Sequence, residues 1–355
     1  MAGALSGLLV ADFSRVLAGP LATMTLGDLG ADVVKVERPG TGDETRSWGP
    51  PWSLDGTSTY YLSVNRNKRG VALDLASPAA RSLALGADVL VENFAPGTME
   101  RFGLGYEDLR AANPRLVYAS ITGFGRSSPS PGYDFLVQAL GGLMSITGSP
   151  DGPPTKAGVA LVDVLAGQQL TTGILAALYA RERSGRGQRV EVSLLGSLLA
   201  ALVNQASAVL NSDVVPGRMG NRHPSIAPYE TYPAADGDVV LAVGNDAQFA
   251  RLLAALGLPS DPRFTTNRDR VQHREALGEL LSTAFGTAPA AHWVDLLTTA
   301  GVPCGSVNTV AEAIALAERL GLTPVVELAG RRSVASPITL SETPISYRLP
   351  PPALD

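Results

Sequence analysis

The chain has 355 residues, of which 45% are hydrophobic and 17% charged, a composition typical of a globular protein with two domains or one large one. The net charge is −5 and the longest basic stretch is the short run at residues 66–69, so neither nucleic acid nor a membrane is expected as a partner. One cysteine, Cys304, and three histidines exclude a disulfide framework and any zinc-ligand spacing, so no bound metal is expected. The first residues lack the basic and apolar segments of a signal peptide, and we expect a cytoplasmic protein.

Short apolar runs alternate with helical segments in the first part of the chain. Residues 8–11 predict a strand, residues 20–29 a helix closed by Gly30, and residues 32–36 a second strand. Further strands are expected over residues 71–75, 88–91 and 116–120. This pattern predicts an α/β fold with a doubly wound, parallel, Rossmann-like sheet. Ligands bind such sheets at the carboxyl ends of the strands, here after Asp12, Glu37, Glu92 and Ile121.

Composition changes at residues 217–228, after helices expected over residues 170–183 and 194–210. Beyond this point, Asp236 and Gly237 predict a hairpin turn between strands at residues 229–232 and 239–243, and helices begin near Asp246, Arg274 and Ala290. We therefore expect a large domain over residues 1–210, a smaller α+β domain over residues 211–321, and a C-terminal segment, residues 322–355, that returns toward the large domain.

Asp163 ends the apolar run at residues 158–162, which places a carboxylate at the tip of an expected buried strand. A desolvated carboxylate attacks an activated acyl group without a separate base. The competing interpretation, which position alone favours, is a helix N-cap.

Other chemistries find less support. The turn at residues 15–20 lacks the spaced glycines of a dinucleotide site, and no P-loop, nucleophile elbow or catalytic triad pattern occurs. Arg38 beside Glu37 is equally compatible with phosphate binding and with a solvated ion pair. Cys304 lies in a short apolar segment and fits a buried, inert thiol.

Motifs over most of the chain resemble the class III CoA-transferases of the CaiB/BaiF type, which include formyl-CoA transferase and carnitine CoA-transferase. The matching stretches are residues 12–20, 30–40, 65–69, 91–97, 132–134 with Gln138, Asp163 with Gly167, and 185–188. Residues 57–68, 244–245 and 301–305 look most like the branch that contains succinyl-CoA:glutarate CoA-transferase. The resemblance implies a CoA-binding domain, an interlocked homodimer, coenzyme A or acyl-CoA as substrate with a small carboxylic acid, and no permanently bound cofactor.

In this family the aspartate at the position of Asp163 is the nucleophile, so the resemblance reverses the preference for an N-cap. It implies an aspartyl anhydride, then an aspartyl-CoA thioester, and a second anhydride through which the acceptor acid receives CoA. Water must be excluded from these intermediates, and a glycine-containing loop at residues 220–224 or 244–246 could cover the site.

Further site residues carry over by position. CoA contacts are implied for Arg15, Val16, Ala18, Arg38, Leu73, Asn93, Phe94 and Arg101. Arg38 and Arg101 would bind phosphates, Leu73 and Phe94 would flank adenine, and the amides of Val16 and Ala18 would face the pantetheine arm. Substrate-binding or lid positions are Tyr133, Gly220, Arg222, His223, Gly244 and Asn245.

Two features bear on the identity of the acyl group: positions that differ from formyl-CoA transferase, and basic residues in a loop. Leu17, Ala76 and Pro131 replace a glutamine and two lysines of formyl-CoA transferase, which disfavours oxalate and favours a longer diacid such as succinate or glutarate. Arg222 or His223 is as compatible with binding the far carboxylate of that diacid as with a solvated loop.

Two alternatives stay open. The related α-methylacyl-CoA racemase uses a histidine and an aspartate for two-way proton transfer, and Tyr133, whose phenol has an ordinary pKa of about 10, is a poor substitute for that histidine. A CoA-binding subunit without turnover is the other alternative, because relatives usually continue through another helix beyond the position of Asp355. The retained Asp163 argues against it.

Overall fold

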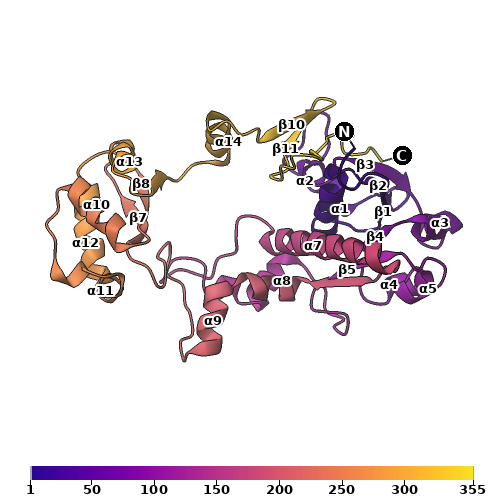
Figure 1. The fold of residues 1–355 in the computed structure, drawn as a ribbon, viewed down its shortest axis with the longest axis horizontal. Coiled ribbons are helices and arrows are strands. Elements are labelled where there is room, and N and C mark those ends of the chain that lie inside the picture. Colours follow the sequence, from indigo (N-terminus) through magenta and orange to yellow (C-terminus); the bar gives the residue numbers. More distant parts are fainter. Residues whose placement is uncertain (1, 355) are drawn as a thin grey trace. The chain divides into compact units, whose positions relative to one another are not determined.

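The computed structural model describes residues 2–354, which form two compact units (Figure 1). The first unit comprises the chain up to Leu143, Lys156–Val215 and the chain from Ala317 on; the second comprises Met144–Thr155 and Pro216–Leu316. The boundaries predicted from the sequence lie near residues 210 and 321 and place residues 144–155 in the large domain. In the structure that segment pairs with the second unit, since the Gly220 N–H donates to the Gly148 carbonyl at 3.0 Å and the Arg218 guanidinium to the Ser149 carbonyl at 3.2 Å.

A six-stranded sheet lies at the centre of the first unit. All its strand pairs are parallel, and the order is β3-β2-β1-β4-β5-β6. This is the order of a doubly wound Rossmann-like sheet, so the predicted fold class is confirmed. The strands are β1 (Leu9–Asp12), β2 (Asp32–Glu37), β3 (Lys68–Ala72), β4 (Val89–Glu92), β5 (Val117–Thr122) and β6 (Arg189–Ser193). Strand β3 begins earlier than expected, and β6 was not predicted.

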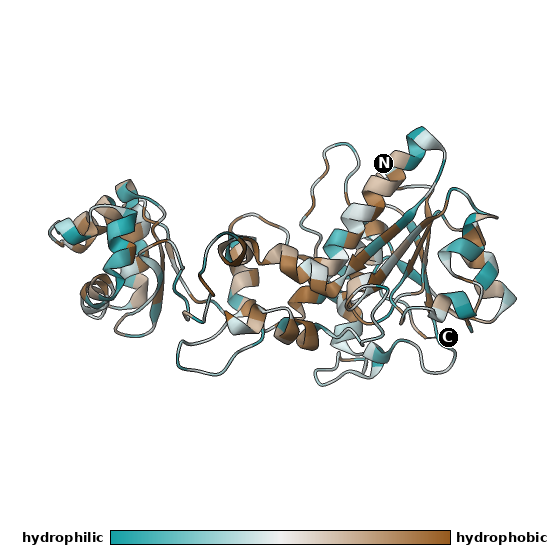
Figure 2. Ribbon diagram, turned by 90° about the horizontal axis from the view of Figure 1, so that it is seen from below, coloured by the Kyte–Doolittle hydropathy of each residue, from teal (hydrophilic) through white to brown (hydrophobic). Residues whose placement is uncertain are grey.

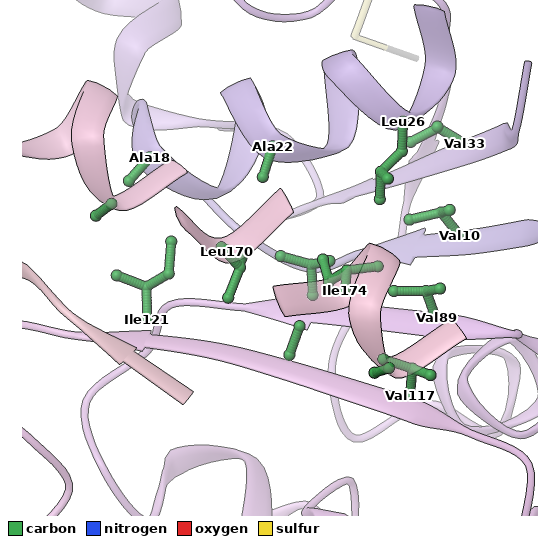
Figure 3. Close-up of a cluster of buried hydrophobic side chains, with 14 of the residues drawn as sticks. Val10, Ala18, Ala22, Leu26, Val33, Val89, Val117, Ile121, Leu170 and Ile174 are labelled. Atoms are coloured by element: carbon green, nitrogen blue, oxygen red, sulfur yellow. The ribbon is translucent and has the colours of Figure 1, made fainter. Parts of the chain in front are cut away.

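Side chains of a strand alternate between the two faces of the sheet. Both faces of this sheet carry apolar side chains, and helices pack on each of them. Val10, Val89 and Val117 join one apolar cluster with α1 and α7, whereas Ala11, Leu90 and Tyr118 join another with the helices after β3 and β4. Figure 3 shows Ala22 of α1 and Ile174 of α7 over the first face. The helices of this unit are α1 (Ala18–Asp28), α2 (Thr59–Ser63), α3 (Pro78–Gly86), α4 (Thr98–Arg101), α5 (Tyr106–Arg110), α6 (Asp134–Leu140), α7 (Leu161–Ser184), α8 (Leu194–Ala201) and α9 (Val203–Asn211), with short 3-10 turns at Glu44–Ser47 and Leu143–Ser145.

Helix α7 is the core helix of the first unit. By length and composition alone it is apolar enough to cross a membrane, as is the bent pair α8 and α9 together. However, Val162, Ala166, Leu170, Ile174 and Ala177 of α7 are buried in the cluster with α1 and the sheet. Apolar residues concentrate on these packed elements (Figure 2). The expected helix over residues 170–183 is therefore confirmed and starts nine residues earlier, at Leu161.

The second unit contains the predicted hairpin. Strands β7 (Tyr229–Pro233) and β8 (Asp238–Ala242) pair antiparallel, and β9 (Cys304–Ser306), which was not predicted, pairs with β8. Phe249, Phe285 and Trp293 are central to its core. Its helices are α10 (Asp246–Leu256), α11 (Asn267–Gln272), α12 (Arg274–Phe285) and α13 (Ala290–Thr299), with a 3-10 turn at Pro262–Phe264; α14 (Val310–Arg319) leads the chain back to the first unit.

The C-terminal segment packs on the first unit through Asn67. It contains the antiparallel pair β10 (Val325–Leu328) and β11 (Arg331–Val334). The Asn67 side-chain oxygen accepts the N–H of Arg348 at 2.7 Å, and the Asn67 N–H donates to the Leu349 carbonyl at 2.8 Å. The basic motif at residues 66–69 is internal over its first three residues, where Arg66 pairs with Asp28 at 2.6 Å in the protein interior, whereas Arg69 is exposed.

Candidate active site

The turn between β1 and α1 is held by buried charges. The Asp12 carboxylate, at the end of β1, accepts hydrogen bonds from Thr23 Oγ1 at 2.7 Å and Lys68 Nζ at 2.9 Å. Burial opposes its charge, but Lys68 and Lys35 outweigh that effect and hold the pKa of Asp12 below its usual range. Burial lowers the pKa of Lys68 to about 8, although Asp12 counteracts the shift. These contacts tie α1 and Lys68 to the end of β1.

Val16 adopts a left-handed backbone conformation with φ 69°, which is rare for a β-branched residue. Its N–H donates to the Asp43 carboxylate at 3.2 Å, and Asp43 pairs with Lys35 Nζ at 2.9 Å. Both side chains of that ion pair are fully buried. Asp43 thus accepts the Val16 N–H that the resemblance assigns to the pantetheine arm, and this contact holds the turn.

The Asn93 side chain also holds this turn through hydrogen bonds to the Arg15 backbone. Its side-chain oxygen accepts the Arg15 N–H at 2.9 Å, and its amide donates to the Arg15 carbonyl at 2.7 Å. The Arg15 guanidinium lies 4.8 Å from the centre of the Phe94 ring. Arg15, Asn93 and Phe94 are thus brought together from the ends of β1 and β4, as the sequence predicted for the rim.

Asp163 is the third residue of α7. The segment directly before α7 is not a strand, and the N-cap of the helix is Ala160. Both placements of Asp163 expected from the sequence, at the tip of a strand and at the N-cap, are therefore wrong. Gly167, one turn later, faces the carbonyl oxygen of Ala18: a Cβ there would lie 2.6 Å from that oxygen. Only glycine permits this approach, which brings the second turn of α7 against the start of α1.

Asp134 caps α7 from another part of the chain. Its Oδ1 accepts the N–H groups of Val162 at 2.7 Å and Asp163 at 3.3 Å. Its Oδ2 accepts Gln138 Nε2 at 2.6 Å, and Gln138 Oε1 accepts the Ala157 N–H at 2.8 Å. Two residues of the motif that carried the resemblance, Asp134 and Gln138, therefore position the helix that bears Asp163.

The Asp163 carboxyl has an unusual pKa. Burial, and secondly the charge of Asp134, raise the pKa of Asp163 to about 7. Tyr60 responds to the same environment, since burial and then Asp163 raise its pKa to about 12. Sequence reasoning missed Tyr60 as a site residue, although it lies in the stretch that suggested the branch. It makes an edge-to-face contact with Trp48, with ring centres 5.1 Å apart.

Two cavities adjoin at this site. A cavity of about 300 Å³ is lined by Asp163, Tyr133, residues 15–18 and residues 93–96. A second cavity, of about 680 Å³, is lined by Arg38, Leu73 and Phe94 among others. Arg15, Glu44 and Phe94 line both. A ligand with a nucleotide at one end and a reactive group at the other could span them. Arg101, by contrast, is exposed and lines neither cavity.

The remaining candidates lie in the second unit. The Arg222 guanidinium pairs with Glu230 at 3.0 Å and with Glu275 at 2.6 Å, so a substrate carboxylate would have to displace these partners. His223 Nδ1 accepts the Ser225 N–H at 3.0 Å. Gly220 has a left-handed φ of 62°, the Gly244 N–H donates to Gln248 Oε1 at 2.7 Å, and Asn245 is the N-cap of α10. Among residues 2–354, no group of three or more potential metal-binding side chains occurs.

The fold and the site define an α/β protein with a partly buried carboxylate beside a nucleotide-sized cavity. The model of CoA-transferase family III matches residues 5–355. A succinate–glutarate CoA-transferase from Agrobacterium fabrum is 44% identical, with 99% of this chain and 92% of the relative covered. An acetyl-CoA:oxalate CoA-transferase from Acetobacter aceti is 42% identical, with 96% and 90% covered. The crystal structure of a CaiB/BaiF family protein from Brucella suis matches with a TM-score of 0.89 and 40% identity, covering 100% of this chain and 97% of that one. The chain belongs to CoA-transferase family III, and the protein is a CoA-transferase that acts on CoA substrates.

Proposed function

We propose that the protein moves CoA from an acyl-CoA to a dicarboxylate such as succinate or glutarate by covalent catalysis on Asp163. The observation that carries this proposal is the position of Asp163 in the smaller cavity, with its pKa raised to about 7 by burial. Near neutral pH a large fraction of the carboxyl is ionised, and the poorly solvated carboxylate is a stronger nucleophile than one in water. The adjoining cavity has room for the nucleotide end of CoA.

The reaction needs no outside reductant, base or ATP. An Asp163 oxygen bonds to the thioester carbon, and the C–S bond breaks with its electron pair leaving on the CoA sulfur. The thiolate attacks the aspartyl carbonyl of the anhydride, which releases the donor acid and leaves CoA on Asp163. The acceptor carboxylate attacks that thioester, and the expelled thiolate bonds to the acceptor carbonyl of the second anhydride, which returns Asp163 as a carboxylate.

The CoA contacts proposed from resemblance fit the cavities in part. Arg38 and Leu73 line the larger cavity, Val16, Ala18 and Asn93 the smaller one, and Arg15 and Phe94 both. Arg101 would need to turn toward a bound phosphate. Tyr133, which lines the smaller cavity, would contact the acyl group. We retain Gly220, Arg222, His223, Gly244 and Asn245 as lid or substrate positions.

Succinate and glutarate are favoured as acids by the relative that is named for them. The oxalate transferase of similar identity makes oxalate the comparison acceptor. We further propose a homodimer in the cytoplasm, without a permanently bound cofactor. The apolar side chains of Leu199, Val203 and Leu210 on α8 and α9, exposed by 49%, 69% and 81%, support a partner surface on the first unit.

Intact mass spectrometry after mixing with succinyl-CoA tests the central claim. An adduct that maps to Asp163, reacts with hydroxylamine and is absent from Asp163→Asn supports it. The matched control is Asp134→Asn, which keeps an oxygen acceptor for the helix N–H groups and should still form the adduct. Transfer of CoA with full activity in Asp163→Asn would refute covalent catalysis at this residue.

A further inference from the structure

The smaller cavity is lined by more carboxyl groups than cationic groups, although a diacid substrate would bring a further negative charge. Its ionisable carboxyl groups are Asp163 and Glu44, and Arg15 is the one Lys or Arg side chain among the described residues that line it. When Asp163 attacks one end of a succinyl or glutaryl group, the other end is a second carboxylate in the same cavity. A carboxylate removed from water needs a cation or several donors. Arg15 is the candidate that the cavity supplies.

The Arg15 guanidinium lines the smaller cavity, and only part of its hydrogen-bonding capacity is satisfied. Its Nη1 donates to Glu44 Oε1 at 2.6 Å, and its plane is steadied by the Phe94 ring at 4.8 Å. Its Nε is buried and has no hydrogen-bond partner among residues 2–354. An arginine binds a carboxylate best through two parallel N–H groups, and Glu44 satisfies only Nη1, which leaves Nε without the second hydrogen bond of such a pair.

Glu44 is a partner that Arg15 can exchange at little cost. The ion pair is about half exposed, with 42% of the Arg15 side chain and 47% of the Glu44 side chain accessible. Exposed pairs of this kind contribute little to stability, because water and salt screen them. Glu44 is nevertheless held nearby, because it directly follows Asp43, whose carboxylate is fixed by Lys35. It can therefore occupy Arg15 whenever the cavity holds no diacid.

We propose that Arg15 binds the distal carboxylate of the diacyl substrate, and that Glu44 takes this place in the free enzyme. Arg15 is thus the residue that distinguishes diacids from monoacids of equal length. This inference rests on the proposed function, and it adds to the CoA contact implied by resemblance. The competing role, a contact with CoA alone, predicts no dependence on the charge of the acyl group.

Binding to Asp163→Asn separates this inference from the proposed chemistry, because no turnover is involved. We would measure by calorimetry the dissociation constants of succinyl-CoA and butyryl-CoA, which have acyl chains of equal length and differ in the distal carboxylate. With Arg15 present, Asp163→Asn should bind succinyl-CoA about tenfold or more tightly than butyryl-CoA. The additional substitution Arg15→Gln should abolish this preference. Arg15→Lys should restore part of it, since the ammonium keeps the charge without the paired N–H groups.

Glu44→Gln provides the second arm. Removal of the competing carboxylate should tighten succinyl-CoA binding by about twofold to fivefold and leave butyryl-CoA unchanged. If Arg15→Gln weakens both thioesters equally, or if the succinyl preference survives it, Arg15 does not bind the distal carboxylate. That result would leave the Asp163 adduct intact. Loss of the adduct in the wild type would instead refute the proposed function while the binding preference remained measurable.

Discussion

The Asp134 carboxylate accepts the backbone N–H of Asp163 at 3.3 Å, and its charge helps raise the pKa of the Asp163 side chain to about 7. One residue thus both positions α7 and disfavours ionisation of the carboxyl that we propose as nucleophile. Burial, which is the larger cause, and the charge of Asp134 together place the ionisation of Asp163 close to neutral pH.

The rate of adduct formation should therefore rise with pH through about 7 and then level off, because the carboxylate is the attacking form. Asp134→Asn removes the negative charge and keeps an oxygen acceptor. It should shift the midpoint of the profile down by about one pH unit. Asp32→Asn, which removes an exposed carboxylate paired with Arg69, serves as the control. An Asp134→Asn profile that overlays the wild type would show that burial alone sets the pKa.

Gly167→Ala tests the close approach of α7 to α1. The added Cβ would lie 2.6 Å from the Ala18 carbonyl oxygen, so backbone must move. We expect a loss of about 1 to 3 kcal/mol in unfolding free energy. A displaced Asp163 should also lower kcat by about tenfold or more. Gly278→Ala in α12 is the matched control, because its Cβ would meet no atom of the described part of the chain within 4 Å. Denaturant unfolding and steady-state kinetics check both effects, and an unaffected Gly167→Ala would contradict them.

Asp43→Ala should destabilise the protein strongly. Lys35 and Asp43 form a fully buried ion pair, and removal of one partner leaves an unpaired buried charge that costs about 3 to 5 kcal/mol. The Val16 N–H also loses its acceptor. The control is Arg110→Ala, which breaks the exposed Arg110–Glu107 pair and should change stability by about 0.5 kcal/mol at most. Equal thermal shifts for the two variants would contradict the proposed importance of the buried pair.

Glu92→Gln should alter the pH dependence of stability. Burial raises the pKa of Glu92 to about 8, well above its value in an unfolded chain. Ionisation of Glu92 is therefore easier in the unfolded state, and the folded state loses stability as pH rises from about 4.5 to about 8. The glutamine keeps an oxygen acceptor for the Phe94 N–H, which Glu92 binds at 2.9 Å. The variant should be more stable than the wild type at pH 8, by about 2 to 5 kcal/mol, and similar near pH 4. Urea unfolding at both pH values measures this difference.

The parts of the fold that could be predicted are those with a local pattern. Strands β1, β2, β4 and β5 are short apolar runs, and buried parallel strands have this composition. Strand β6 was missed because Arg189 and Glu191 alternate with valines at the edge of the sheet, where side chains are partly accessible. Strand β9 has three residues and obtains its partner from β8, more than sixty positions earlier in the chain.

The sequence identified which residues belong to the candidate site better than it predicted their conformations. Asp163 carried a family motif, but its helical position depends on Asp134, 29 residues away. The capture of the Val16 amide depends on Asp43 and Lys35, which only the folded sheet brings together. Tyr60 and Glu44 had no local signal for a role beside Asp163 or Arg15. Contacts of this kind follow from tertiary packing, which hydrophobic periodicity does not encode.

The hydrogen bonds of Asn67 also bear on how the polypeptide matures during synthesis. Asn67 accepts a hydrogen bond from Arg348, 281 positions later, and both belong to the first unit. At about 5 to 20 residues per second a ribosome makes these two segments about 14 to 56 s apart. The second unit is complete before the last part of the first one is made. The nascent first unit therefore keeps its Asn67 side exposed until the segment that contains Arg348 has been made, and it closes only then.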